Sequence, residues 1–203
     1  MSIREVSTLL IAIFVGIHFD YLLVMKKTFA LTLLALLSLT TFAQKDNGGI
    51  EWISIYELEN AMANEPRKVV IDVYTDWCGW CKRMDATTFK NEVIADYVNE
   101  KYYAVKLDAE QKDSISFRDH TFKFVKQGKR GYHELAAALL QGKMSYPSIV
   151  YLDEELNMIQ PVPGYQDAAQ FEKVIKYFGG NHYKNKKFED FQKEFTSSLP
   201  AKS

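Results

Sequence analysis

Cysteine is scarce in this chain: among 203 residues there are two, Cys78 and Cys81, in a Cys-x-x-Cys pattern. The chain has no second cysteine pair at short spacing, which a structural zinc site would need. A histidine directly after the second cysteine is also missing, because Lys82 stands there, and covalent haem attachment requires that histidine. The chemistry of the two cysteines therefore has to come from the pair itself.

An excess of charge is lacking as well. The formal net charge is −1. Residues 44–203 hold 22 basic and 24 acidic side chains, because residues 1–43 contain three of the 25 basic and two of the 26 acidic ones. This near-neutrality gives no reason to expect a nucleic acid or an anionic membrane as partner. Internal repeats and low-complexity tracts are absent too, so residues 44–203 are expected to form one domain.

Residues 25–43 have the layout of a secretory signal peptide. Two lysines follow Met25, and after them come an apolar run and a short stretch of small and polar residues, with a cut expected after Ala43. No cysteine follows that cut directly, which argues against a lipoprotein anchor. We therefore expect the mature chain, residues 44–203, to be exported to the periplasm or the extracellular space.

Residues 1–24 form a second apolar stretch, interrupted by His18 and Asp20. They are either a mistranslated extension ahead of the true start at Met25 or an uncleaved membrane anchor. We favour the extension, because an aspartate is costly in a lipid-facing span and the signal peptide is complete without these residues.

Export affects which role is expected for the cysteine pair. Paired cysteines in an oxidising compartment are usually structural disulfides. A bridge between Cys78 and Cys81 would close a very short loop, however, and would constrain the unfolded chain little. A purely structural role is therefore physically weak.

Hydrophobic periodicity and capping residues predict an alternation of strands and helices. The segments expected in the first half are a strand at 50–53, a helix from the capping box Ser54/Glu57 to Asn64, a strand at 68–75, a helix from Cys78, a helix at 91–101 and a strand at 102–108. Those expected in the second half are an extra strand or a loop with a turn at Gly128, a helix at 132–142, a β-hairpin at 147–153 and 158–164, a helix after its cap Asp167, and a helix at 187–196 whose Phe188, Phe191 and Phe195 pack in the core. This order predicts an α/β fold with a central mixed sheet flanked by helices on both faces.

The strand at 68–75 leads directly into the cysteines, which then open a helix. At that place backbone N–H groups point outward and the helix dipole favours negative charge, so the pKa of the Cys78 thiol is expected to be lowered. Cys81 lies one turn further along the same helix face, within disulfide reach. Cys78 is therefore the expected nucleophile, and Cys81 is the cysteine expected to resolve the mixed disulfide.

The stretch VVIDVYTDWCGWCKRM, together with YPS at 146–148 before a later strand, resembles the thioredoxin superfamily. It is similar in particular to exported thioredoxin-like proteins and to the C-terminal domain of transmembrane disulfide reductases, which share a D-W-C-x-x-C-K pattern. The resemblance covers residues 50–180 and includes Gly164 before the last core helix. It implies a thioredoxin fold with an inserted segment before a cis-proline loop at Pro147.

The resemblance also implies roles for particular residues. Asp72 falls where thioredoxins bury an aspartate beneath the second cysteine, and it would accept the proton of Cys81. A polar strand-end role is the alternative, but a carboxylate within VVIDVY is costly to bury without a purpose. Lys106 falls where the family's lysine approaches that aspartate, although a solvated lysine is equally consistent with the pattern. The expected substrate-binding residues surround the cysteines: Trp77, Gly79, Trp80, Tyr146 and Pro147.

The sequence departs from the family pattern in three places. Gly79-Trp80 stands where thioredoxins have Gly-Pro, which leaves the redox potential open, and Ala86 replaces the proline that usually kinks the helix. The stretch from Lys106 to Pro147 is longer than the minimal fold needs, which leaves the partner surface open. Its basic residues are interpreted as a solvated face: Arg118, Lys123, Lys126, Lys129 and Arg130.

The sequence thus predicts an exported thiol–disulfide oxidoreductase, most simply a reductase of protein or small-molecule disulfides. Neither Gly79 nor Trp80 adds a charge that would stabilise a thiolate, which favours a reducing pair that a membrane thiol donor recharges. We expect a monomer with no cofactor and no metal. The alternatives are a non-catalytic module that uses the thioredoxin groove for docking, and a metal-handling chaperone that would recruit a distant histidine among His120, His133 and His182.

Overall fold

Strands and helices alternate along residues 49–200, the part of the chain that this computed structural model describes. The strands are β1 (Trp52–Ile53), β2 (Lys68–Tyr74), β3 (Tyr102–Asp108), β4 (Ile115–Phe117), β5 (His120–Phe122), β6 (Phe124–Gln127), β7 (Arg130–His133), β8 (Ser148–Leu152) and β9 (Met158–Pro163). The helices are α2 (Ile55–Asn64), α3 (Gly79–Ala86), α4 (Glu92–Lys101), α5 (Glu134–Leu139), α6 (Ala168–Gly179) and α7 (Phe188–Glu194), with short 3-10 helices η1 (Thr88–Lys90) and η2 (His182–Lys184).

The expected signal peptide at 25–43 and the expected extension or anchor at 1–24 lie outside the described residues. Within residues 49–200, no helix has the length and apolarity that crossing a bilayer requires.

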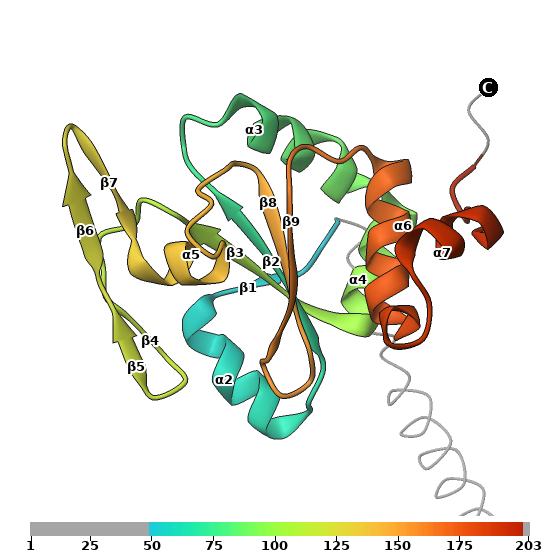
Figure 1. Ribbon diagram of the computed structural model, residues 1–203, viewed down its shortest axis with the longest axis horizontal. Coiled ribbons are helices and arrows are strands. Elements are labelled where there is room, and N and C mark those ends of the chain that lie inside the picture. The colour runs from blue at the N-terminus through green and yellow to red at the C-terminus, as the bar shows by residue number, and fades with distance from the viewer. Residues whose placement is uncertain (1–48, 201–203) are drawn as a thin grey trace, which may run out of the picture. The chain divides into compact units, whose positions relative to one another are not determined.

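Five strands form the central sheet in the order β1-β3-β2-β8-β9 (Figure 1). β3 is parallel to both of its neighbours, β1 and β2, whereas β8 is antiparallel to both β2 and β9. This is the mixed sheet that the sequence predicts. β2 lies in the middle of the sheet and is buried along most of its length, as its nearly continuous apolar side chains require.

Helices cover both faces of the sheet, with α4 and α6 on one side and α2 and α5 on the other (Figure 1). Alternate residues of β2 face these two sides. Val69, Ile71 and Val73 pack with α2 and α5, while Val70 packs with α3, α4 and α6. Asp72 shares the side of Val70, so the period of the strand directs its carboxyl group toward α3.

The predicted helix starts are confirmed by their caps. The Ser54 hydroxyl accepts a hydrogen bond from the backbone N–H of Tyr56 at 3.2 Å, and Glu57 accepts one from the Ser54 N–H at 2.8 Å. Asp167 caps α6 by accepting the N–H of Gln170 at 2.8 Å. These caps satisfy backbone donors that a helix start leaves without partners.

The inserted segment between β3 and β8 contains two β-hairpins, β4–β5 and β6–β7, followed by α5. The expected turn at Gly128 is confirmed and connects β6 to β7, with a φ of 61°. The β4–β5 hairpin is not among the predicted elements. Its turn residues Arg118 and Asp119 have φ values of 48° and 59°, and neither is the glycine or asparagine that usually marks such a turn.

Helix α5 is shorter than the helix predicted over 132–142. Tyr132 and His133 belong to β7, and the His133 side chain caps α5 by accepting the N–H of Leu135 at 3.2 Å. At the other end Gly142 has a φ of +75° and its N–H donates to the carbonyl of Ala137 at 2.8 Å. The predicted glycine stop is therefore correct.

The phenylalanine stripe of α7 packs in the core, as expected. Phe191 is buried, and Phe188 and Phe195 are half-buried against the same core cluster. The Tyr177 ring of α6 lies 5.1 Å from Phe188 and 5.3 Å from Phe191. These contacts pack α7 against α6. The cysteines lie elsewhere, at the start of α3.

Candidate active site

The two cysteines lie where the chain passes from β2 into α3, and a disulfide joins them. Cys78 is the N-cap residue of α3, and its Sγ accepts a hydrogen bond from the backbone N–H of Cys81 at 3.0 Å. Both side chains are buried, with 5% of Cys78 and 2% of Cys81 exposed. N–H groups at the start of a helix favour negative charge. In the reduced protein this geometry therefore stabilises a thiolate on Cys78 rather than on Cys81.

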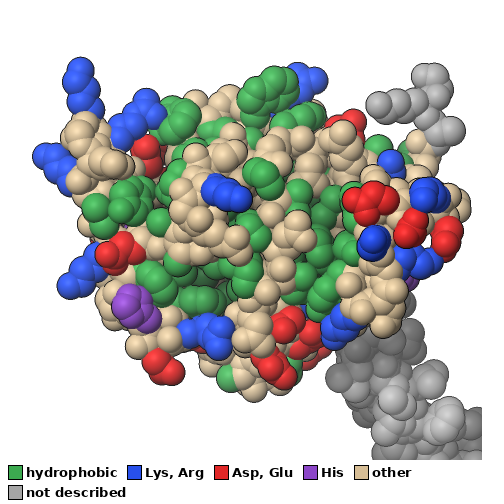
Figure 2. Space-filling model, in the orientation of Figure 1, with side chains coloured by type: hydrophobic (Ala, Val, Ile, Leu, Met, Phe, Trp, Pro, Cys, Tyr) green, Lys and Arg blue, Asp and Glu red, His purple; other side chains and the backbone are tan. Residues whose placement is uncertain are grey.

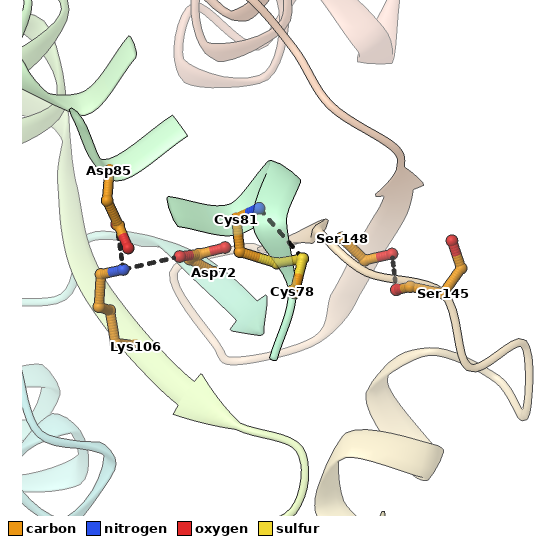
Figure 3. Close-up of a disulfide and its surroundings, with 7 residues drawn as sticks. All are labelled: Asp72, Cys78, Cys81, Asp85, Lys106, Ser145 and Ser148. Carbon is orange, nitrogen blue, oxygen red and sulfur yellow. Dashed lines mark hydrogen bonds and ion pairs between the residues drawn. A yellow bond between two sulfur atoms is a disulfide. The ribbon is translucent and has the colours of Figure 1, made fainter. Parts of the chain in front are cut away.

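Asp72 comes from β2 and lies opposite Lys106 in the register of β2 with β3. The Asp72 side chain is 1% exposed, and its Oδ2 accepts a hydrogen bond from the Lys106 ammonium at 3.0 Å. Its Oδ1 is also buried, and no residue of the described chain hydrogen-bonds to it. Figure 3 shows the carboxyl group between Lys106 on one side and the cysteines on the other. The lysine is therefore a partner of Asp72 and not merely a solvated residue.

Burial raises the pKa of Asp72 from 3.8 to about 6, although the charge and hydrogen bond of Lys106 act in the opposite direction. A carboxyl group with this pKa is ionised at neutral pH, yet it is close enough to neutrality to take up a proton from a nearby donor. Such a proton can bind at Oδ1, which has no hydrogen-bond partner within residues 49–200.

Lys106 also binds Asp85, which lies on α3 one turn after Cys81. Burial lowers the pKa of Lys106, but the attraction of Asp72 and Asp85 outweighs this and the pKa is raised. The ammonium group further faces three aromatic rings, with its Nζ at 5.1 Å from the centre of Trp52, 5.0 Å from Tyr74 and 5.6 Å from Phe89. Cation–π attraction and two carboxylates hold this lysine charged and in place.

Two pairs of aromatic rings flank the disulfide. The Trp77 ring meets Tyr146 edge to face at 5.9 Å, and the Trp80 ring lies 5.0 Å from Tyr165. Both tryptophans are exposed, at 51% for Trp77 and 58% for Trp80. Exposed rings on either side of a buried disulfide form a surface on which an extended polypeptide segment can lie.

The loop at Pro147 lies beside the cysteines because Ser148, the first residue of β8, pairs with Val73 near the end of β2. The Tyr146–Pro147 peptide bond is cis, as expected. The Ser148 hydroxyl donates to the carbonyl of Ser145 at 2.7 Å (Figure 3), and the N–H of Gly164 donates to the carbonyl of Pro147 at 2.8 Å. These bonds fix the loop from both sides.

The structure thus brings every residue of the predicted site to one end of the sheet, around the start of α3. Gly79 opens α3, and a Cβ there would meet no atom within 4 Å, so this position faces open space. Asp85, Tyr165 and Arg130 are neighbours of the site that the sequence prediction does not assign to it. Of these, Asp85 could have been placed near the site from the sequence, because it follows Cys81 by one turn of the predicted helix. The other two approach the site from distant parts of the chain.

The histidines considered for a metal lie apart from the cysteines. His133 is buried as the cap of α5, and its Nε2 is 3.1 Å from the carbonyl of Asp113. His120 packs against Phe122 in β5, and His182 packs against Phe191. Within residues 49–200, no group of three or more histidine, cysteine, aspartate or glutamate side chains has an arrangement that could hold a metal ion.

Residues 56–179 match the family model of the thioredoxin-like domain. The chain belongs to this family. The thioredoxin fold predicted from the sequence is thereby confirmed, with the inserted hairpins and α5 between β3 and the cis-proline loop. The thiol:disulfide interchange protein DsbD of Pectobacterium atrosepticum is 25% identical over 127 residues, which are 62% of this chain and 19% of that protein. The chain therefore spans about a fifth of the length of this relative.

Solved structures with similarity to the chain include three that differ in source. A thioredoxin-fold protein from Helicobacter pylori is 20% identical, with 75% of this chain and 90% of that one covered and a TM-score of 0.49. A thioredoxin from Thermus thermophilus is 15% identical, with 66% and 93% covered and a TM-score of 0.48. The reduced C-terminal domain of DsbD from Neisseria meningitidis is 20% identical, with 64% and 90% covered and a TM-score of 0.38.

The raised pKa of Asp72 predicts a pH-dependent stability difference between the native protein and Asp72→Asn. Below pH 4 the carboxyl is protonated in the folded and the unfolded chain. Between pH 4 and about 6 the folded state holds its proton more tightly, so rising pH removes stability from the native protein but not from Asp72→Asn. Above the pKa of about 6, the variant should be more stable by an amount on the order of 3 kcal/mol. Urea unfolding of both oxidised proteins from pH 4 to pH 8 measures this, and a difference that does not change with pH would contradict it.

Asp85 should control the pKa of Asp72 through Lys106. In Asp85→Asn, a negative charge that raises the pKa of Asp72 is removed, and Lys106 keeps Asp72 as its remaining ionic partner. The pKa of Asp72 should therefore fall, by up to about one pH unit. Carbon-13 NMR titration of the Asp72 carboxyl carbon measures this directly. Asp190→Asn, on α7, is the matched control and should leave the value where it is in the native protein.

Proposed function

We propose that this protein is an exported reductase of protein disulfides that works through the Cys78–Cys81 pair. The observation that carries the proposal is the disulfide at the start of α3, which lies near the buried carboxyl group of Asp72 (Figure 3), whose pKa is about 6. A structural disulfide needs neither a proton acceptor nor exposed aromatic rings around it. A dithiol that has to lose a proton at one sulfur and bind a polypeptide needs both.

The reaction begins with the reduced pair. The thiolate of Cys78 attacks one sulfur of a substrate disulfide; the substrate S–S bond breaks, and the departing substrate sulfur leaves as a thiolate that takes a proton from water. The thiol of Cys81 then gives its proton to Asp72 and attacks the Cys78 sulfur. The mixed disulfide breaks, the second substrate sulfur leaves, and the protein retains the Cys78–Cys81 disulfide. Two electrons have passed from the protein dithiol to the substrate.

Asp72 acts as the general base of the second step in this proposal. Its ionised carboxylate accepts the Cys81 proton at Oδ1, the oxygen without a hydrogen-bond partner among residues 49–200. It then passes the proton to water, because a carboxyl group with a pKa of about 6 is ionised at neutral pH. Lys106 keeps the carboxylate ionised in a buried site, and it is a positioning residue because it acts through Asp72.

The substrate segment is proposed to lie across the two aromatic pairs. Trp77 and Tyr146 contact it on one side of Cys78, and Trp80 contacts it on the other. Gly79 leaves room beside the sulfur, and the backbone of the Tyr146–Pro147 loop is available for hydrogen bonds to an extended chain.

Reduction of the Cys78–Cys81 disulfide after each reaction needs a dithiol donor outside the domain. The relative from Pectobacterium atrosepticum is named a thiol:disulfide interchange protein, which supports a partner of that chemistry, and we propose that the donor is a membrane protein. The signal-peptide pattern at 25–43 supports export.

Substitution of each cysteine tests the reaction. Cys78→Ser should lower the reduction of a model disulfide protein to the background rate, because the attacking sulfur is lost. Cys81→Ser should accumulate a mixed disulfide with the substrate at Cys78, visible as an adduct by mass spectrometry, because resolution is blocked. Equal turnover by the native protein and Cys78→Ser would show that the domain is a docking module without redox activity.

A further inference from the structure

The tip of the β6–β7 hairpin is a basic projection. Residues 121–133 contain four basic side chains and no aspartate or glutamate. At the base of the hairpin Glu134 accepts the backbone N–H of Lys123 at 2.7 Å, so the excess charge gathers toward the tip. Lys126, Lys129 and Arg130 are exposed there. Figure 2 shows Lys and Arg side chains standing out at the left, where Figure 1 places β6 and β7.

This tip is connected to the wall of the active site. The Arg130 guanidinium lies over the Trp77 ring, with its Cζ at 4.4 Å from the ring centre. Trp77 precedes Cys78 in the chain and contacts Tyr146. Arg130, Trp77 and Tyr146 therefore form a continuous ledge from the hairpin to the cis-proline loop. Arg130 is thus not simply part of a solvated face, as the sequence suggested.

Close packing between β6 and β7 fixes the conformation of the hairpin. At Gly131 an added Cβ would lie 2.2 Å from Cζ of Phe124 and 2.4 Å from the carbonyl oxygen of Val125, so only glycine allows the two strands to pack as they do. The Phe124 ring is covered on another side by Lys112, whose Nζ is 3.3 Å from the ring centre.

Negative charges also lie next to Trp77. Glu110 accepts a hydrogen bond from the Trp77 indole N–H at 3.2 Å, and Asp76 is exposed next to Trp77. A substrate segment is therefore repelled where its acidic residues approach Glu110 and Asp76. It is attracted if they lie further along, where the ledge reaches Arg130 and Lys129.

We infer that the β6–β7 hairpin selects substrate proteins that carry an acidic run on one side of their disulfide, at a distance from the reacting cysteine. The inference rests on the proposed reductase function and names its substrate class. Lys126, Lys129 and Arg130 attract the acidic run, while Trp77 and Tyr146 hold the segment that contains the disulfide.

Two synthetic peptides test this selection. Both contain the same intramolecular disulfide, separated by a short neutral spacer from a run of glutamates in one peptide and of glutamines in the other. The pre-reduced native protein should reduce the glutamate peptide with a second-order rate constant about tenfold higher than for the glutamine peptide at low ionic strength, and the preference should shrink at high salt. In Lys126→Glu/Lys129→Glu the ratio of the two values should fall to one or below.

A charge-matched control separates the hairpin from the net charge of the protein. Lys184→Glu/Lys193→Glu changes two exposed lysines on η2 and α7 and should retain the native ratio. Equal rate constants for the two peptides with the native protein, or an equal loss of the preference in both double variants, would overturn the inference and leave the reductase function standing. If the reduced protein reduces neither peptide, the proposed function is overturned, and the inference with it.

Discussion

The ion pair between Asp72 and Lys106 joins the two central parallel strands on the side that carries the cysteines, and the active end of the molecule depends on it. Burial alone would drive the carboxyl group to its neutral form. The positive charge of Lys106 lowers the pKa of Asp72, and the negative charge of Asp85 raises it again. The balance leaves a pKa of about 6. A weaker contact with Lys106 would raise the pKa of Asp72 further, and the neutral acid could accept no proton. A stronger contact would lower the pKa, and the carboxylate would bind the proton of Cys81 too weakly.

Much of this arrangement can be predicted from the sequence, because local rules determine it. The apolar run around Asp72 predicts a buried strand, and its period of two places the carboxyl on the face of α3. Capping residues such as Ser54 and Asp167 mark helix starts that the structure confirms. Long-range contacts are what a single sequence does not reveal. Arg130 reaches Trp77 across more than fifty residues of chain, and a hairpin with Arg118 in its turn lacks the residues by which such turns are recognised.

The inserted segment adds residues to one side of the active site. The other side is formed by elements of the common thioredoxin fold. Trp80 meets Tyr165, which lies between β9 and α6, so that wall comes from elements the fold itself needs. Trp77 instead lies between Tyr146 and the tip of an added hairpin. The tip of the added hairpin is basic, and Glu110 and Asp76 place negative charge next to Trp77. This division provides a physical basis for substrate selection that leaves the cysteine chemistry unchanged.

The central claim is that the pair donates electrons, and its reduction potential tests that claim most directly. The residues between the cysteines carry no charge, and the carboxylate of Asp72 disfavours a nearby thiolate. The reduced form therefore gains little stability beyond what the start of α3 gives the Cys78 thiolate. Equilibration of the purified protein with glutathione buffers, read by alkylation of Cys78 and Cys81, should give a potential near that of thioredoxin, at about −270 mV. A potential above about −180 mV, in the range of the disulfide isomerases and oxidases, would contradict the account.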